Sequence, residues 1–358
     1  MDDGSLVAVS VLKGEELPLS DDQARRLLGI PTDRWIRVDE TGDLAALREL
    51  AFHGLIVSDG PDERLAELRR RDEQLASPAW NRYAALYHSL TRWADVRAVV
   101  AGEAPLPEGR GRWPPPPHFH AVSEPVAVNQ LPLVEPKRPL YELLLKRKTS
   151  RGFDANASLS LAELATVLHY VWGCHGALEV RDELTILKKT SPSGGSQHPI
   201  EVYPLVRAVE GVRPGLYHYA VEDHELELLE SLTGDEVTAL SMEFTAGQAH
   251  FSSAQVLFLM TARFGRNFWK YAAHAKAYRV LYLDAAHLSQ TLYLVCAELG
   301  LGAFVSAAIN EDNIDRRLRL QPFTEGAILL SGCGRPAPSQ REPQYRRHTP
   351  RGARPRTM

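Results

Sequence analysis

The stretch TSPSGGSQHPIEVY, residues 190–203, joins a dense run of small and turn-forming residues to a run of β-branched and aromatic residues typical of a strand. Pro192 restricts one backbone angle, whereas Gly194 and Gly195 permit positive φ and let another molecule approach the main chain closely. The same turn carries hydroxyl, amide and imidazole groups on Ser193, Ser196, Gln197 and His198. A flexible linker would not need these groups, so the loop is predicted to hold a ligand.

Two common phosphate and nucleophile motifs are absent from this loop. It lacks the GxxxxGK[ST] pattern of a nucleotide P-loop, and its serines do not occupy a GxSxG nucleophile elbow. Hydrolase chemistry is therefore disfavoured. Ser193 and Ser196 are expected to act as hydrogen-bond donors.

Regular elements are predicted on both sides of the loop. Apolar residues recur at helical spacing in LSLAELATVLHYVWG (159–173), and ELTILKK (183–189) has strand character. Further strands are predicted downstream in segments 200–209, 215–229 (a hairpin), 254–264, 300–309 and 326–336. The longest helix signal runs from Tyr278 to Leu299 and ends at Gly300. Its length and apolar surface indicate a core helix or a subunit contact.

Composition limits the class of protein. The chain has 358 residues, of which 44% are hydrophobic and 24% charged, so two globular units are expected. The formal net charge of -4 gives no sign of a nucleic-acid or membrane surface. The acidic start MDDGSLVAVS does not resemble a signal peptide, and a cytoplasmic protein is expected.

The first 78 residues are predicted to form a small module. SLVAVSVL (5–12) and RWIRVDE (34–40) have strand character, and helices are expected in SDDQARRLLGI (20–30) and DLAALRELAFHGLI (43–56). This order suggests a winged-helix-like module. A structural cap and a peptide-binding wing both remain open, whereas the lack of a Lys/Arg face disfavours nucleic acid.

Residues 79–139 are predicted to form a helix followed by a Pro-rich linker. The helix would pack through an apolar and aromatic stripe made of Tyr83, Leu86, Tyr87, Leu90, Trp93 and Val96. His118 and His120 lack companion ligands at metal spacing, so no metal site is expected there. The main domain is expected over 140–340, and residues 341–358 form a basic tail that is expected to be flexible.

A cationic segment opens the main domain. LYELLLKRKTSRGFD (140–154) places Lys146, Arg147, Lys148 and Arg151 within six positions, beside the hydroxyl groups of Thr149 and Ser150. Arginine forks bind phosphate bidentately, and short hydroxyls add neutral donors. A solvated surface is the alternative, but the predicted ligand-binding loop in the same domain favours an anion site.

Taken together, the motifs RKTSRGF, PSGGSQHPIEVY, GLYHY, WKY…AYR, DAAHLSQTLYLVCAELGLGAF and SGCGRP resemble the FMN-dependent nitroreductase superfamily. Within it, the SagB-type peptide-maturation dehydrogenases, the azoline oxidases, are the most similar in these motifs. The likeness covers residues 140–336. It implies an α+β fold, a nitroreductase-like three-layer sandwich, that forms a domain-interlocked homodimer with FMN in a cleft between subunits.

The resemblance also assigns residues to the cofactor. Arg147, Thr149 and Arg151 match the family's R-x-[ST]-x-R element for flavin phosphate and ribityl oxygens, and Lys148 joins them. The family's loop that reaches the flavin from the partner subunit corresponds to Pro192, Ser193, Gly194, Gly195, Ser196 and Gln197. Ser196 stands where many nitroreductases have Asn, which puts a direct amide contact in doubt. The stretch near the flavin N5 edge corresponds to Val305, Ser306, Ala307 and Ala308, and Arg335 is a further phosphate ligand.

Lys270 and Tyr271 match the pair that the azoline oxidases use in proton transfer. Oxidation by a flavin removes a hydride, and a base must also remove a proton from the substrate. Lys270 in a partly desolvated cleft could serve as this base, with Tyr271 orienting or relaying the proton. The alternative is that Lys270 is a surface residue and Tyr271 packs.

The resemblance implies an FMN-dependent oxidoreductase that oxidises a ribosomally made precursor peptide, most simply from azoline to azole. Its expected partners are that peptide, a second copy of the chain and a cyclising or cyclodehydratase enzyme, with no nucleic acid or membrane. In related enzymes a winged-helix-like unit binds a leader peptide. Two alternatives stay open: NAD(P)H-driven reduction of nitro compounds or quinones, and a flavin-free scaffold that presents the peptide.

Overall fold

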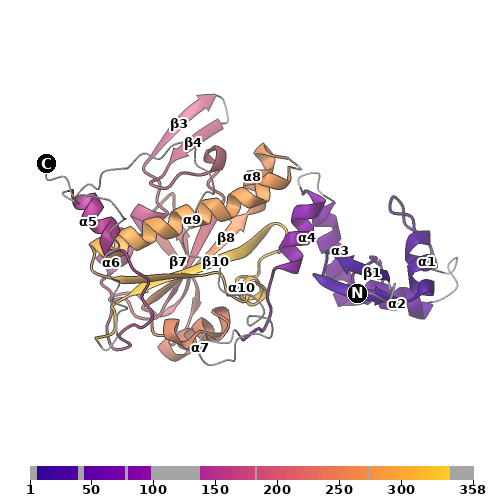
Figure 1. Cartoon of the computed structure of the whole chain (residues 1–358), viewed down its shortest axis with the longest axis horizontal. Coiled ribbons are helices and arrows are strands. Elements are labelled where there is room, and N and C mark those ends of the chain that lie inside the picture. Colours follow the sequence, from indigo (N-terminus) through magenta and orange to yellow (C-terminus); the bar gives the residue numbers. More distant parts are fainter. Residues whose placement is uncertain are drawn as a thin grey trace, which may run out of the picture.

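The computed structural model describes residues 6–38, 44–76, 80–97, 138–181, 184–272 and 274–338. Its centre is a six-stranded antiparallel sheet with the strand order β7-β6-β5-β8-β10-β9 (Figure 1). The strands are β5 (Ile200–Val206), β6 (Gly215–Ala220), β7 (Glu225–Ser231), β8 (Val256–Arg263), β9 (Gly302–Ser306) and β10 (Glu325–Gly334). Each of them overlaps a segment predicted to be a strand, although β7 extends two residues past its segment and β10 begins one residue before its own.

Strand β8 shows why the sheet lies between two layers. Val256, Phe258 and Met260 belong to one buried cluster, whereas Leu257 and Leu259 belong to another. Successive side chains of a strand point to opposite faces of the sheet. A strand that is apolar on both faces therefore needs cover on both.

Helices provide that cover. On one face lie α6 (Leu161–Val171) and the 24-residue α9 (Ala275–Glu298), and on the other lie α7 (Gly234–Phe244) and α10 (Glu311–Leu318) (Figure 1). This arrangement confirms the predicted three-layer α+β architecture. The helix α9 ends near the predicted residue, because Gly300 takes a φ of 70° directly after its last turn.

Three shorter elements surround α9. The helix α5 (Pro139–Lys146) packs against α9, and α8 (Phe264–Lys270) connects β8 to the start of α9. The strands β3 (Gly176–Arg181) and β4 (Leu184–Lys188) form a separate hairpin that projects from the body (Figure 1). The hairpin leads directly into the loop at 190–199.

The N-terminal module differs from its prediction in one strand. Strands β1 (Leu6–Ser10) and β2 (Glu15–Leu19) form a hairpin, followed by α1 (Asp21–Gly29), α2 (Leu44–Phe52) and α3 (Glu63–Leu75). The predicted strand at 34–40 is wrong over its described residues, because residues 34–37 have no regular structure and Val38 lies in a 3-10 turn. The partner of β1 is instead the segment next along the chain, brought back by a turn in which Gly14 has a φ of 67°. The helices at 20–30 and 43–56 are confirmed, and Ser20 forms the predicted N-cap.

The predicted packing stripe of α4 (Arg82–Leu90) is also wrong. Tyr83 and Tyr87 are 70% and 56% exposed, and the buried face consists of Ala84, Ala85 and His88. Small residues let the helix approach the body closely, so the bulky aromatic residues face outward. The packing contact comes from Trp80, which lies against Phe264, Phe268 and Phe323.

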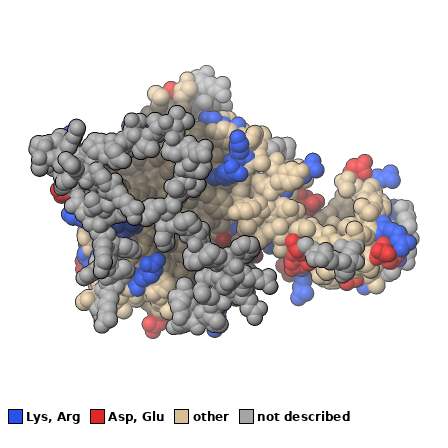
Figure 2. Space-filling model, viewed as in Figure 1, with Lys and Arg blue, Asp and Glu red and all other residues tan. Residues whose placement is uncertain are grey.

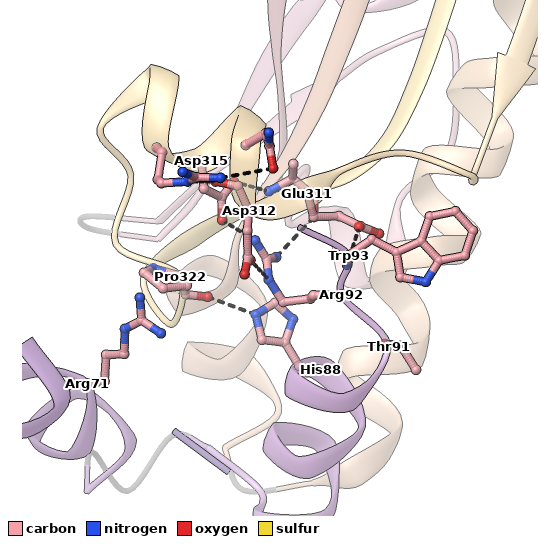
Figure 3. Close-up of polar contacts among 12 residues, drawn as sticks. Arg71, His88, Thr91, Arg92, Trp93, Glu311, Asp312, Asp315 and Pro322 are labelled. Atoms are coloured by element: carbon pink, nitrogen blue, oxygen red, sulfur yellow. Dashed lines mark hydrogen bonds and ion pairs between the residues drawn. The ribbon is translucent and has the colours of Figure 1, made fainter. Parts of the chain in front are cut away.

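A buried ionic cluster joins the segment after α4 to the body (Figure 3). Arg92 Nε donates to Asp312 Oδ1 at 2.7 Å, and Arg92 Nη2 donates to Asp315 Oδ2 at 2.6 Å. His88 is hydrogen-bonded to the carbonyl oxygen of Pro322 at 2.9 Å and to the hydroxyl of Tyr278 at 2.7 Å. Burial raises the pKa of Asp315 to about 6, although Arg92 acts in the opposite direction.

Two predicted segments cannot be compared with the structure. The Pro-rich linker with His118 and His120, and the tail at 341–358, lie outside the described residues. Within the described part of the chain, no helix is both long enough and apolar enough to cross a membrane.

Candidate cofactor and catalytic site

Helix α9 contacts two groups of predicted site residues, the loop at 190–199 and the cationic segment at 147–151. Its Asp284 and His287 contact the loop at 190–199, and its Tyr293 contacts the cationic segment at 147–151. Asp284 and Tyr293 are nine positions apart on this α-helix, a rise of about 13.5 Å. The two groups are therefore fixed at opposite halves of one rigid element.

A buried carboxylate holds the loop. Asp284 is 3% exposed, and its Oδ2 accepts from Ser193 Oγ at 2.6 Å while its Oδ1 accepts from the Gly194 N–H at 3.0 Å. Ser193 Oγ also accepts from the His198 N–H at 2.9 Å. Ser193 is thus a hydrogen-bonding residue, as predicted, but its partners lie in its own chain. Asp284 was absent from the predicted site, although an acidic residue among the apolar positions of a long helix was a signal that could have identified it.

The two loop glycines are required by close packing. A Cβ added at Gly194 would collide with Val280 on α9. Gly195 has a φ of 62°, and a Cβ there would lie 2.5 Å from the Tyr271 hydroxyl and 2.7 Å from Lys270 Nζ. The glycines were predicted to let another molecule approach the main chain; the groups that approach it here are side chains of this chain.

Lys270 and Tyr271 are brought to the loop by α8. Lys270 Nζ donates to the Gly195 carbonyl oxygen at 3.0 Å and lies 5.8 Å from the centre of the Tyr271 ring. Arg266, one turn earlier, donates from Nε to the Gln197 carbonyl oxygen at 2.7 Å. Lys270 is exposed in the single chain, so the described residues do not supply the desolvation expected of its cleft.

Polar residues fill the space behind the loop. Burial lowers the pKa of His198, whose Nε2 lies 3.1 Å from the Leu187 carbonyl oxygen, and the charge of Lys189 lowers it further. Burial also lowers the pKa of Lys189, which donates to the Trp172 carbonyl oxygen at 2.8 Å. Together with Asp284 these side chains line a cavity of about 10 Å³, room for one water molecule. Neither Lys189 nor this cavity was predicted.

The cationic segment is arranged differently. The guanidinium carbon of Arg147 lies 5.2 Å from the centre of the Tyr293 ring, and Thr149 Oγ1 lies 3.0 Å from the Tyr293 hydroxyl. Ser150 pairs through its N–H with the Ala303 carbonyl oxygen on β9, at 2.9 Å. Its side-chain oxygen is buried and has no hydrogen-bond partner among the described residues. Arg151 is exposed.

Two further predicted segments lie beside this one. The Asp154 N–H donates to the Arg335 carbonyl oxygen at 2.9 Å, while Arg335 Nη2 lies 2.8 Å from both carboxylate oxygens of Glu163. Ser306, at the end of β9, accepts from Gln248 Nε2 at 3.1 Å. Arg335 thus already has a carboxylate partner in this chain.

The cationic segment matches the chemistry of FMN. A phosphate requires cations and short hydroxyl donors, and a polyol chain requires further hydrogen-bonding groups. Arg147, Arg151 and Thr149 supply the first set, and the buried hydroxyl of Ser150 has no hydrogen-bond partner in the part of the chain that the structure describes. The residues present are therefore suited to hold this cofactor.

Comparisons with known proteins assign the domain. The model of the nitroreductase family matches residues 144–335. MJ1384 of Methanocaldococcus jannaschii, named as a nitroreductase, is 29% identical over 207 residues, which are 58% of this chain and 95% of that protein. The trifolitoxin-processing protein TfxB of Rhizobium leguminosarum bv. trifolii is 28% identical over 206 residues, 53% of this chain and 55% of TfxB.

A solved structure shares the fold over a larger part of the chain. One chain of the Escherichia coli microcin synthetase McbBCD complex with truncated pro-MccB17 bound aligns with a TM-score of 0.54 and 18% identity. The alignment covers 75% of this chain and 96% of that one. The family match spans more than half of the sequence and coincides with the three-layer domain described above. The chain belongs to the nitroreductase family.

Proposed function

We propose that this protein is a cytoplasmic FMN-dependent dehydrogenase that oxidises a ribosomally made precursor peptide, in the simplest case from azoline to azole. The observation that carries the proposal is the contact of Lys270 with the Gly195 carbonyl oxygen, beside the Tyr271 hydroxyl. Two relatives support a peptide substrate: TfxB is named for processing trifolitoxin, and the microcin synthetase complex has a truncated pro-MccB17 bound.

The proposed cofactor residues are those of the cationic segment. Arg147, Thr149 and Arg151 would bind the phosphate and ribityl oxygens, with Lys148 beside them. The loop residues 192–197 and the segment 305–308 would border the ring system. Arg335 could contribute only if its ion pair with Glu163 is shared or released.

Removal of two hydrogens from a ring requires a hydride acceptor and a proton acceptor. Bound FMN supplies the hydride acceptor, at N5. The Lys270 amine would take the proton, because the Gly195 carbonyl oxygen fixes where its nitrogen lies. Tyr271 would orient the proton, since its hydroxyl lies against the same glycine.

A homodimer is part of the proposal. The eight residues of α5 include no buried side chain, and Leu140, Tyr141, Leu144 and Leu145 are 43–74% exposed. Apolar side chains that remain this exposed on a helix of the single chain are typical of a subunit contact. A second copy packed on α5 would bury these four apolar side chains.

The N-terminal module is proposed to bind the leader segment of the peptide. The strand β1 exposes Leu6, Val7 and Val9, and its only sheet partner among the described residues is β2. A peptide could add to the free edge as a further strand. A cyclising enzyme, such as a cyclodehydratase, would act before this protein.

One experiment tests both whether the protein binds FMN and whether it oxidises a peptide. The purified protein should be yellow, retain FMN on gel filtration and remove two hydrogens from an azoline-containing peptide, as measured by mass spectrometry. The variants Lys270→Ala and Tyr271→Phe should lose peptide oxidation and keep FMN. Rapid turnover of a nitroarene with NADPH would instead favour the nitro or quinone reductase, and a colourless protein that takes up no FMN would favour a scaffold.

A further inference from the structure

One part of the chain is uniformly cationic. Residues 262–283 include five Lys or Arg side chains and no acidic residue, in a protein whose formal net charge is -4. The five are Arg263, Arg266, Lys270, Lys276 and Arg279. They lie on α8, on the residue before it and on the first turns of α9, and we call this surface the cationic corner.

The fold turns all five side chains outward. Arg263, Arg266 and Lys270 are spaced three and four residues apart, which places them on one side of α8, and each of them is exposed. Lys276 and Arg279 are three residues apart on α9 and are exposed as well. Figure 2 shows blue side chains gathered near the region where α8 lies in Figure 1.

Much of this charge is not neutralised. Arg263 is paired with Glu201 at 3.1 Å, but the side chains of Lys276 and Arg279 have no carboxylate partner among the described residues. Lys276 also lies in the first turn of α9, where no acidic residue is present to offset the positive end of the helix dipole. The corner therefore presents a positive potential to solvent.

An exposed indole lies among these cations. Trp269 is 65% exposed on α8, next to Lys270 in the sequence. Exposed tryptophan together with arginine is typical of the side chains that contribute most to protein and peptide interfaces. The corner thus combines charge with a large apolar contact.

The corner is continuous with the candidate catalytic site. Arg266 and Lys270 belong to it and also donate to the carbonyl oxygens of Gln197 and Gly195 in the loop. We infer that the corner binds an acidic segment of the peptide substrate and so selects which peptides are oxidised. This inference rests on the proposed function.

The spread of the charges favours a peptide over a nucleotide. A single phosphate is bound by two or three converging donors. Here the cations follow the length of α8, a rise of about 10 Å, and continue onto a second helix. Carboxylates spaced along an extended peptide match this row.

Fluorescence anisotropy tests the inference with two probes. One is a fluorescein-labelled peptide of alternating Asp and Gly, and the other replaces each Asp by Asn. Full-length protein should bind the Asp peptide at least about tenfold more tightly at low ionic strength, and the preference should fall in 0.5 M salt. The double variant Lys276→Glu/Arg279→Glu should abolish the preference, because neither side chain makes a hydrogen bond that the loop needs.

The matched control is Arg82→Glu/Arg213→Glu, which makes the same change in net charge at two exposed positions outside the corner. It should bind the Asp peptide nearly as well as the wild type. An equal loss in the control would overturn the inference, and so would equal binding of both peptides by the wild type. A corner variant that becomes monomeric, or that loses affinity only for NADPH, would overturn it too. The assay does not depend on flavin, so failure of the proposed dehydrogenase would show separately, as missing FMN or peptide oxidation.

Discussion

The loop at 190–199 and the cationic segment at 147–151 contact the same helix but are satisfied to different degrees. In the loop, Asp284 binds Ser193 and Gly194, and Lys270 binds the Gly195 carbonyl oxygen, so the main contacts come from the chain itself. In the segment, the hydroxyl of Ser150 is buried and has no hydrogen-bond partner among the described residues. The loop is therefore already fixed before any ligand binds, whereas the segment has a buried hydroxyl group with which a ligand could form a hydrogen bond. Changes in the loop should act on folding, and changes in the segment on binding.

The largest effect is expected for Gly195→Val. The new side chain must adopt a φ of 62° and would collide with Lys270 and Tyr271. Strain and overpacking together should lower the free energy of unfolding by about 3 kcal/mol, measured by urea denaturation. The control is Gly211→Val, which has a φ of 75° but nothing within 4 Å of the added carbon, so it should cost about 1 kcal/mol. Equal costs would mean that the loop is not held by packing.

Asp284→Ala should come next. It leaves the Gly194 N–H and the Ser193 hydroxyl without their acceptor inside the structure, which should cost about 2 kcal/mol of stability. Asp284→Asn keeps one acceptor oxygen and should recover part of that loss. If the alanine variant were as stable as the wild type, the loop would not depend on α9, and the contrast with the segment would fail.

Arg151→Ala should separate binding from folding. The free energy of unfolding without added cofactor, measured by urea denaturation, should stay within about 0.5 kcal/mol of the wild type, because the side chain is exposed. The dissociation constant for FMN, followed by quenching of flavin fluorescence, should rise about tenfold through loss of one charged phosphate contact. Unchanged FMN affinity would contradict the assignment of this segment to the phosphate.

The smallest effect concerns the pH dependence of the loop. Burial lowers the pKa of His198 below its ordinary value of 6.5. At pH values between the folded and the unfolded pKa, the folded protein therefore binds fewer protons than the unfolded chain. His198 thus contributes stability above about pH 6.5, and this contribution is lost as the pH falls through the folded pKa. The variant His198→Asn tolerates the positive φ of 46° and should flatten this dependence.

Other groups act with the opposite sign, so the comparison must be a difference between variant and wild type. Burial raises the pKa of Glu311 to about 7 and that of Asp315 to about 6, which lowers stability as the pH rises through this range. Both groups are present in each protein and cancel. A difference in stability that does not change between pH 5 and pH 7.5 would show that His198 does not titrate with folding.

The sequence predicted the body of the fold better than its periphery. Strand β8 and helix α9 carry long apolar patterns that only one kind of element can bury, so their type and position were predictable. The strand β2 was missed because EELPL carries two acidic residues and a proline, and among the described residues it pairs with β1 alone. The exposed stripe of α4 was misassigned because a helix can also pack through small residues.

The candidate site shows a similar division. The loop and the cationic segment were predicted from local motifs, the pair Lys270–Tyr271 was assigned by the family resemblance, and the structure brings the pair to the loop. The contacts of Asp284 with the loop and of Arg335 with Glu163 join residues about 90 and 172 positions apart. No local pattern specifies such pairings, because they follow from how the helices and the sheet pack.

The nine-residue interval between Asp284 and Tyr293 constrains how this protein can change over evolutionary time. One residue inserted there would turn the two side chains by about 100° relative to each other, so one of them would leave its partner. Insertions and deletions in this interval should therefore be selected against, whereas substitutions on the outer side of the helix remain permitted. Related chains should differ in length within their loops and agree in length here.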